Sequence, residues 1–254
     1  MKPFRIHLSL LLVTMLLVSS MPALSANAAY PAAPPGDGPG QCTDPEAVLD
    51  QSISRQMKDS SLPGLAVSLV SRDRVLLTKG YGYADLEADR PVDPRQTLFP
   101  VGSVAKPVTW LAVMQLVEQA LVDLDRPANE YLPAGVQIPE QFDQPITVEN
   151  LMTHSAGFED RIIGIFARDP MDLPSPESYF AGFGFPKQVE PPGRFTVYCN
   201  DCVVLAALIV EQVSGQSFEA YIEKNIFDPL GMQHSTFRQL LPDGFGGELA
   251  RVTV

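Results

Sequence analysis

The longest runs of apolar residues predict two helices that are buried in a core. In residues 104–120 (VAKPVTWLAVMQLVEQA), apolar side chains occur on most sides of a helix, which is typical of a core helix. Residues 202–213 (CVVLAALIVEQV) have the same character and are followed by Ser214-Gly215, where a helix is expected to end. Because Pro107 lacks a backbone N–H, it is tolerated only near a first turn, so the first of these helices begins close to Ser103.

Runs of β-branched and aromatic residues predict a β-hairpin nearer the N-terminus. Gly64–Ser71 (GLAVSLVS) and Val75–Tyr83 (VLLTKGYGY) are strand-like and are joined by the polar turn Arg72-Asp73-Arg74. Before the hairpin, Pro45–Lys58 spaces its apolar residues among polar ones, as a surface helix does, and Asp44 is placed to cap it.

Two shorter helices are indicated by their capping residues. Thr147–His154 reads as a short helix that Gly157 closes, and Ser217 is expected to cap an amphipathic helix that runs through Asn225. The many Gly, Pro and Phe residues of 157–192 predict irregular surface structure between the two.

The N-terminus has the pattern of a secretory signal peptide. Basic residues precede an apolar run, Ile6–Val18, and small residues then end in Ala26-Asn27-Ala28. The run is shorter than the ~20 residues of a spanning helix, which disfavours the alternative of a membrane anchor. We therefore expect a signal peptide at 1–28, a Pro/Gly-rich linker at 29–43 and one folded domain at 44–254. The mature protein would be secreted or periplasmic, without a transmembrane anchor.

Composition narrows the possible partners. The chain has 254 residues and 45% hydrophobic content, enough for one large domain or two small lobes. Its formal net charge of −12 disfavours nucleic acid as a partner, although high charge is also a common route to solubility. The three cysteines and the histidines His154 and His234 lack the spacing of a zinc site, so we expect no metal and no cofactor.

The pair Ser103 and Lys106 is the candidate for nucleophilic chemistry. A serine hydroxyl is a poor nucleophile until a base takes its proton. Residues three apart at a helix start project from the same face, so Lys106 can reach Ser103. A lysine acts as a base only when neutral, a state that burial and a helix N-terminus favour, and the same helix end offers the Ser103 N–H as an oxyanion donor. The alternative is a capping serine beside a solvated lysine.

Four segments resemble the serine beta-lactamase-like and penicillin-binding family, which includes class C beta-lactamases and related esterases. They follow in the family's order between about Leu62 and Phe237, and they are FPVGSVAKPVTWLAVMQLVEQALVDLDRPANEYLP (99–133), LMTHSAGF (151–158), PPGRFTVYCN (191–200) and FDPLGMQHSTF (227–237). The resemblance implies an α+β fold of the beta-lactamase/transpeptidase type. In such a fold an antiparallel sheet is flanked by helices and joined to an all-helical lobe.

The resemblance also implies roles for particular residues. Ser103 would be the nucleophile and Lys106 its partner, Tyr198 would relay the proton to the leaving group, and Asn200 would hold Lys106 and a substrate amide. The alternative is a tyrosine packed at a helix start with Asn200 as its N-cap. His154 carries no catalytic role in the family segment and is interpreted as a structural loop residue.

The sequence departs from the family in two places. Cys199 and Cys202 stand where relatives usually have Ser and Gly; two buried thiols are the favoured expectation, with a local disulfide or a redox pair as alternatives. Nothing after Asn200 matches the family's third element, Lys-Thr-Gly or His-x-Gly. The resemblance therefore predicts a domain that is incomplete at its C-terminus, without the last strands of its sheet.

Together these observations predict an exported serine hydrolase that forms an acyl-enzyme. Its substrate would be an ester, a beta-lactam or a D-amino-acid peptide, either as a small molecule or within a cell-wall peptide. The alternative is a catalytically impaired penicillin-binding or regulatory protein, or a fragment that lacks the third motif. The oligomeric state is left open.

Overall fold

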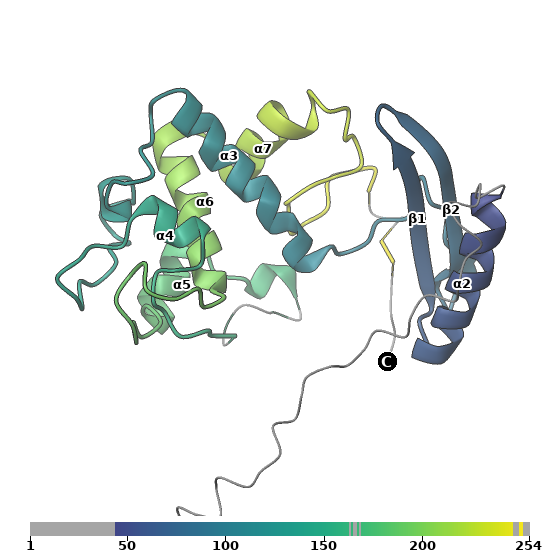
Figure 1. The fold of residues 1–254 in the computed structure, drawn as a ribbon, viewed down its shortest axis with the longest axis horizontal. Coiled ribbons are helices and arrows are strands. Elements are labelled where there is room, and N and C mark those ends of the chain that lie inside the picture. The colour runs from purple at the N-terminus through teal and green to yellow at the C-terminus, as the bar shows by residue number, and fades with distance from the viewer. Residues whose placement is uncertain (1–43, 163, 165–166, 168, 246–248, 251–254) are drawn as a thin grey trace, which may run out of the picture. The chain divides into compact units, whose positions relative to one another are not determined.

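A computed structural model describes residues 44–162, 164, 167, 169–245 and 249–250 of the chain (Figure 1). The predicted signal peptide and linker, at 1–28 and 29–43, lie outside the described residues. The first described element is helix α2, Pro45–Ser60, and the predicted cap is present, because Oδ1 of Asp44 accepts the N–H groups of Glu46 and Ala47, both at 3.1 Å.

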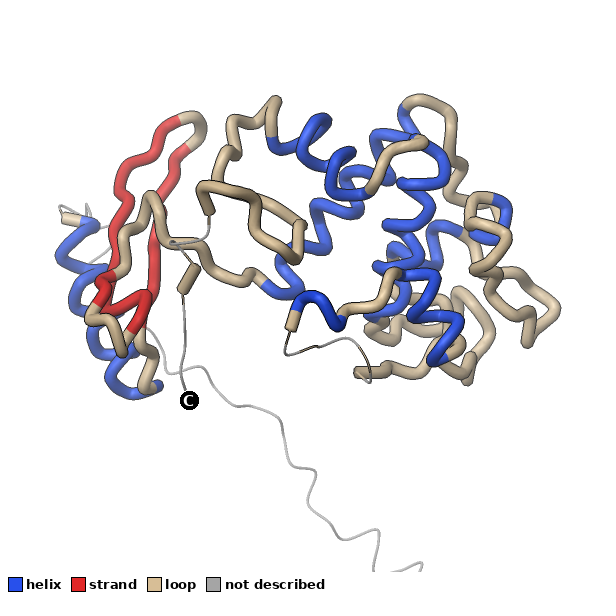
Figure 2. The backbone as a smooth tube through the Cα atoms, turned by 180° about the vertical axis from the view of Figure 1, so that it is seen from behind, coloured by secondary structure: helices blue, strands red, loops and turns tan. Residues whose placement is uncertain are grey.

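The predicted hairpin is confirmed. Strand β1, Gly64–Ser71, pairs antiparallel with β2, Arg74–Asp85, and Arg72 takes a left-handed backbone conformation, φ 53°, in the turn between them. A short third strand, β3 at Arg90–Pro91, pairs antiparallel with β2, so the sheet order in the described residues is β1-β2-β3. Figure 2 shows the strands confined to this part of the chain.

The remaining elements are mostly helical. A single 3₁₀ turn, Gly102–Ala105, leads into α3. The helices after the sheet are α3 Lys106–Glu118, α4 Val148–Met152, α5 Pro176–Phe183, α6 Asn200–Ser214 and α7 Phe218–Ile222. A π-helical turn, Glu223–Phe227, continues α7. Helices α3 and α6 pack side by side (Figure 1). The two apolar runs of the sequence therefore became the two core helices, as predicted.

Helix α6 supplies the largest share of the helical core. Its side chains from Leu205 to Val210 are buried on most sides, and they belong to one cluster with Val113 and Leu116 of α3 and Leu151 of α4. Burying an aliphatic side chain of this size contributes about 1.5–3 kcal/mol, so this packing holds the N-termini of α3 and α6 in a fixed relation. Both candidate segments of the site begin at these N-termini.

Two local predictions need correction. The segment 157–192 is not wholly irregular, because α5 forms within it, with Ser175 as N-cap and with Tyr179 and Phe180 buried. Helix α4 is closed by His154 in a left-handed conformation, φ 56°, before the chain reaches Gly157. Short helices depend on caps and tertiary burial more than on periodicity, which explains both differences.

The fold class is α+β, as expected from the sequence, with an antiparallel sheet and a mostly helical core. Near its described end the chain returns to the segment before the site, where Ala250 donates its N–H to the carbonyl of Leu98 at 2.8 Å and Arg90 donates to the carbonyl of Leu249. Among the described residues no single helix has the length and apolarity to cross a membrane; α6 and Phe218–Phe227 meet that test only as a pair bent by 77°.

Candidate active site

Ser103 and Lys106 lie at the junction of the 3₁₀ turn and α3. Gly102 has a positive φ of 53°, a conformation that L side chains rarely adopt, and it turns the chain into the short helix that carries Ser103. Lys106 opens α3, and Pro107 follows at the second position, where its missing N–H leaves no helical bond unmade. Lys106 Nζ donates a hydrogen bond to Ser103 Oγ at 2.9 Å.

From the start of α6, Tyr198 reaches Ser103 and Asn200 reaches Lys106. The hydroxyl of Tyr198 donates to Ser103 Oγ at 2.6 Å, and Lys106 Nζ donates to Asn200 Oδ1 at 3.0 Å. The ammonium also lies 4.8 Å from the centre of the Tyr198 ring. The structure thus brings all four predicted site residues together, while Asn200 is the first residue of α6 and Cys199 is its N-cap.

The exposure of these groups differs in a way that suits a reaction site. Ser103 and Tyr198 are exposed, with Tyr198 at 43%, while Lys106 and Asn200 are half-buried behind them. The pKa of Tyr198 is lowered from its ordinary value of 10.0, first by its hydrogen bond with Lys106 and then by the one with Ser103. The phenolic proton is therefore easier to remove here than in free tyrosine, at an atom in contact with the serine oxygen.

His154 supports this arrangement from behind. Its Nδ1 accepts the backbone N–H of Cys199 at 3.2 Å, and its ring packs against that of Tyr198, with centroids 4.8 Å apart and the planes tilted by 33°. The pKa of His154 is lowered by burial and then by the positive charge of Lys106. A neutral imidazole leaves Nδ1 free to accept the Cys199 N–H, which agrees with the interpretation of His154 as a structural residue.

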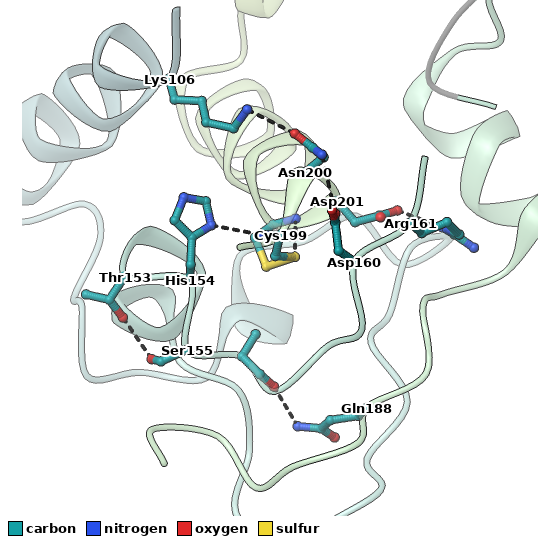
Figure 3. The surroundings of a disulfide bond; sticks show 12 residues. Lys106, Thr153, His154, Ser155, Asp160, Arg161, Gln188, Cys199, Asn200 and Asp201 are labelled. Carbon is teal, nitrogen blue, oxygen red and sulfur yellow. Dashed lines mark hydrogen bonds and ion pairs between the residues drawn. A yellow bond between two sulfur atoms is a disulfide. The ribbon is translucent and has the colours of Figure 1, made fainter. Parts of the chain in front are cut away.

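Two residues that the sequence did not single out hold the start of α6. Asp160 Oδ1 accepts the Asn200 side-chain N–H at 3.4 Å, which leaves the amide oxygen of Asn200 to face Lys106. Arg161 forms an ion pair of 2.6 Å with Asp201, which is buried, and also donates to the carbonyls of Phe183 and Gly184 (Figure 3). The one signal in the sequence was an acidic residue at the start of an apolar helix, which needs a partner once it is buried.

Cys199 and Cys202 are joined as a disulfide directly beneath the site (Figure 3). The two residues are 2% and 0% exposed. The favoured expectation of two free buried thiols is therefore wrong, and the alternative of a local disulfide describes the structure. Within the part of the chain that the structure describes, no group of three or more His, Cys, Asp or Glu side chains could hold a metal ion.

Known proteins share much of this sequence. The sequence profile of the family described as Beta-lactamase matches residues 49–246, which is most of the chain. This chain belongs to the beta-lactamase family. PbpX of Bacillus subtilis (strain 168), named as a penicillin-binding protein, is 35% identical over 188 residues, which are 74% of this beta-lactamase family member and 44% of PbpX.

Solved structures share the fold. The octameric penicillin-binding protein homologue from Pyrococcus abyssi is 31% identical with a TM-score of 0.69, over 80% of this family member and 47% of that chain. A beta-lactamase/D-alanine carboxypeptidase from Yersinia pestis, 22% identical with a TM-score of 0.67 over 81% and 60% of the two chains, shares the fold. The family member described here thus spans about half the length of the proteins it matches.

Proposed function

We propose that this chain is an exported serine hydrolase that acts through an acyl-enzyme on Ser103. The observation that carries the proposal is the position of Ser103, an exposed residue whose Oγ is contacted by both Lys106 Nζ and Tyr198 OH. A hydroxyl so placed can lose its proton to a neighbour as it attacks, which is the requirement for nucleophilic catalysis by serine.

The proposed reaction has two acyl transfers. Ser103 Oγ attacks a carbonyl carbon, and the proton of Oγ passes to the phenolate form of Tyr198, which the neighbouring Lys106 ammonium favours. The bond to the leaving group then breaks, and the leaving oxygen or nitrogen takes that proton, which leaves an ester on Ser103. In the second step water attacks this ester and gives a proton to the Tyr198 phenolate. That proton passes to Ser103 Oγ as the ester bond breaks, so that a carboxylic acid is released and the serine is restored.

The contacts indicate which step of the proposed reaction each side chain assists. Tyr198 touches the reacting oxygen and has a lowered pKa, which suits a group that accepts and returns a proton. Lys106 supplies positive charge beside both oxygens, and Asn200 holds the lysine in place at 3.0 Å. The Ser103 backbone N–H, at the start of the helical segment, is the proposed first donor to the oxyanion.

For the substrate, we propose an ester, a beta-lactam or a D-amino-acid peptide met outside the cytoplasm. Relatives support this class by name, since PbpX is named as a penicillin-binding protein and the Yersinia pestis neighbour as a beta-lactamase/D-alanine carboxypeptidase. Export is supported by the predicted signal peptide at 1–28.

Covalent labelling tests the proposal. The protein without residues 1–28 is incubated with a fluorescent penicillin and, separately, with a fluorophosphonate, beside a Ser103→Ala variant, and the adduct mass is followed over time. We expect an adduct on the peptide that contains Ser103, absent from Ser103→Ala. An adduct on another serine, or no adduct with either probe on a folded protein, contradicts the proposal.

A second candidate function is that of a penicillin-binding or regulatory protein, in which Ser103 is acylated but the acyl group is hardly hydrolysed. This candidate is supported by the relative PbpX, which is named as a penicillin-binding protein. The lifetime of the adduct distinguishes this protein from a hydrolase. An adduct that decays within minutes supports the hydrolase, and one that persists for hours supports the binding protein.

A further inference from the structure

Cys199, which forms the disulfide with Cys202, lies between the two residues that approach Lys106 at the start of α6. Cys199 separates Tyr198 from Asn200 in the sequence, and Figure 3 shows the sulfur atoms beneath the Lys106–Asn200 hydrogen bond. With exposures of 2% and 0%, neither cysteine can touch a substrate. Any effect of the disulfide on the site must therefore act through its neighbours.

The chain changes conformation at this point. Cys199 is extended, with φ −139° and ψ 110°, and Asn200 is the first helical residue of α6. The disulfide links this extended residue to the first turn of the helix, and the Cys199 side chain also caps the Cys202 N–H at 3.0 Å. On its other side, the Cys199 N–H is held by His154. Cys199 is thus fixed at both its backbone and its sulfur.

We propose that the Cys199–Cys202 disulfide is a positioning element of the site, which holds Tyr198 and Asn200 against Lys106, so that its reduction slows acylation of Ser103. The effect on rate rests on the proposed function, whereas the effect on the position of Tyr198 does not. Displacing a reacting group by about 1 Å can slow a reaction ~100-fold, so a small shift at Cys199 is enough.

The reductant would be a dithiol. One of its thiolates attacks a sulfur of the disulfide and forms a mixed disulfide; its second thiol then displaces the protein sulfur. The dithiol is oxidised to a disulfide, and its two electrons and two protons remain on Cys199 and Cys202 as thiols. Because both sulfurs are buried, we expect reduction only when the start of α6 opens locally.

The test removes the cross-link and keeps the helix cap. In a Cys42→Ser background, which leaves Cys199 and Cys202 as the remaining cysteines of the three in the sequence, Cys199→Ser/Cys202→Ala is compared with the oxidised parent. Serine is a favourable N-cap, so an effect of the double variant cannot be explained by loss of the helix cap. The parent protein is also reduced with dithiothreitol, and its thiols are counted by alkylation and mass spectrometry. This reduced parent lacks the disulfide without any further substitution.

Two readouts decide the outcome. We expect the Ser103 adduct with the fluorophosphonate to form at least ~10-fold more slowly in the reduced and double-variant forms than in the oxidised parent. We also expect the phenolate absorbance of Tyr198, obtained by difference from Tyr198→Phe, to titrate at higher pH in both forms, because the tyrosine leaves Lys106. Circular dichroism checks that each form is folded. If the double variant does not fold, the test rests on the comparison of the reduced and oxidised parent.

Unchanged adduct formation together with unchanged Tyr198 titration overturns the proposal. If no form reacts with any probe, the proposed function fails, but the Tyr198 titration still decides whether the disulfide positions the residue. If the rate falls and the titration stays, the disulfide acts elsewhere and the positioning role is rejected.

Discussion

The hydroxyl of Tyr198 lies 2.6 Å from the oxygen of Ser103, across 95 residues of sequence. This contact depends on α3 and α6, because the packing of their apolar faces brings the two helix N-termini together. The same packing places Lys106 within reach of both oxygens. Four side chains from two segments therefore form one hydrogen-bonded group at the protein surface.

Replacing Tyr198 by phenylalanine is expected to slow acylation of Ser103 by about 100-fold or more, since a positioned acid–base group contributes on that scale. The ring and its packing against His154 remain, so we expect the fold to be retained. The rate of adduct formation measures the effect. Tyr83→Phe, at an exposed tyrosine of β2, is the matched control and should react like the parent. If Tyr198→Phe reacts as fast as the parent, the hydroxyl of Tyr198 takes no part in acylation.

The pH dependence of acylation should report the lowered pKa of Tyr198. Since its hydrogen bond with Lys106 is the larger cause of that shift, the rate should rise with pH and reach its midpoint below the ordinary tyrosine value of 10.0. In Lys106→Met, the phenolate absorbance of Tyr198 should titrate at higher pH than in the parent. Identical titration in the two proteins would show that Lys106 does not act on the tyrosine.

The stability of the folded protein should fall as the pH is lowered from about 7 to 5.5. Burial and Lys106 lower the pKa of His154 from 6.5, so the unfolded chain binds a proton at a higher pH than the folded one. The stabilisation is therefore present above 6.5 and is lost as the pH falls toward the folded value. Urea denaturation at each pH measures it. His154→Asn, which also tolerates the left-handed backbone, should show a flatter dependence over the same range.

Breaking the ion pair of Arg161 and Asp201 should destabilise the protein. The two side chains are 14% and 2% exposed, and removing one partner of a buried pair costs about 3–5 kcal/mol, because the other charge is left without compensation. Arg161→Leu and Asp201→Leu should each lower the urea midpoint strongly, and the double variant should lose less than their sum. Fully additive losses would mean that the two side chains do not stabilise each other.

Much of the secondary structure followed from local patterns. The hairpin, the two core helices and the caps Asp44 and Ser217 were predicted, because strand alternation, helical periodicity and capping chemistry act within a few residues. Helix α5 was missed, since eight residues rich in Phe, Gly and Pro carry little periodicity. Its stability comes from the burial of Tyr179 and Phe180, which only the folded chain shows.

For the site, the sequence by itself determined which atoms are available: Ser103 and Lys106 are three residues apart at a helix start, and Tyr198 and Asn200 bracket a cysteine at another. Only the tertiary structure decided that these two helix starts meet, that Asp160 orients Asn200, and that the two cysteines are joined rather than free. The physical reason is range. Helix and cap geometry fix neighbours within a turn, whereas contacts between residues 40 or 95 positions apart exist only after apolar packing has fixed the backbone.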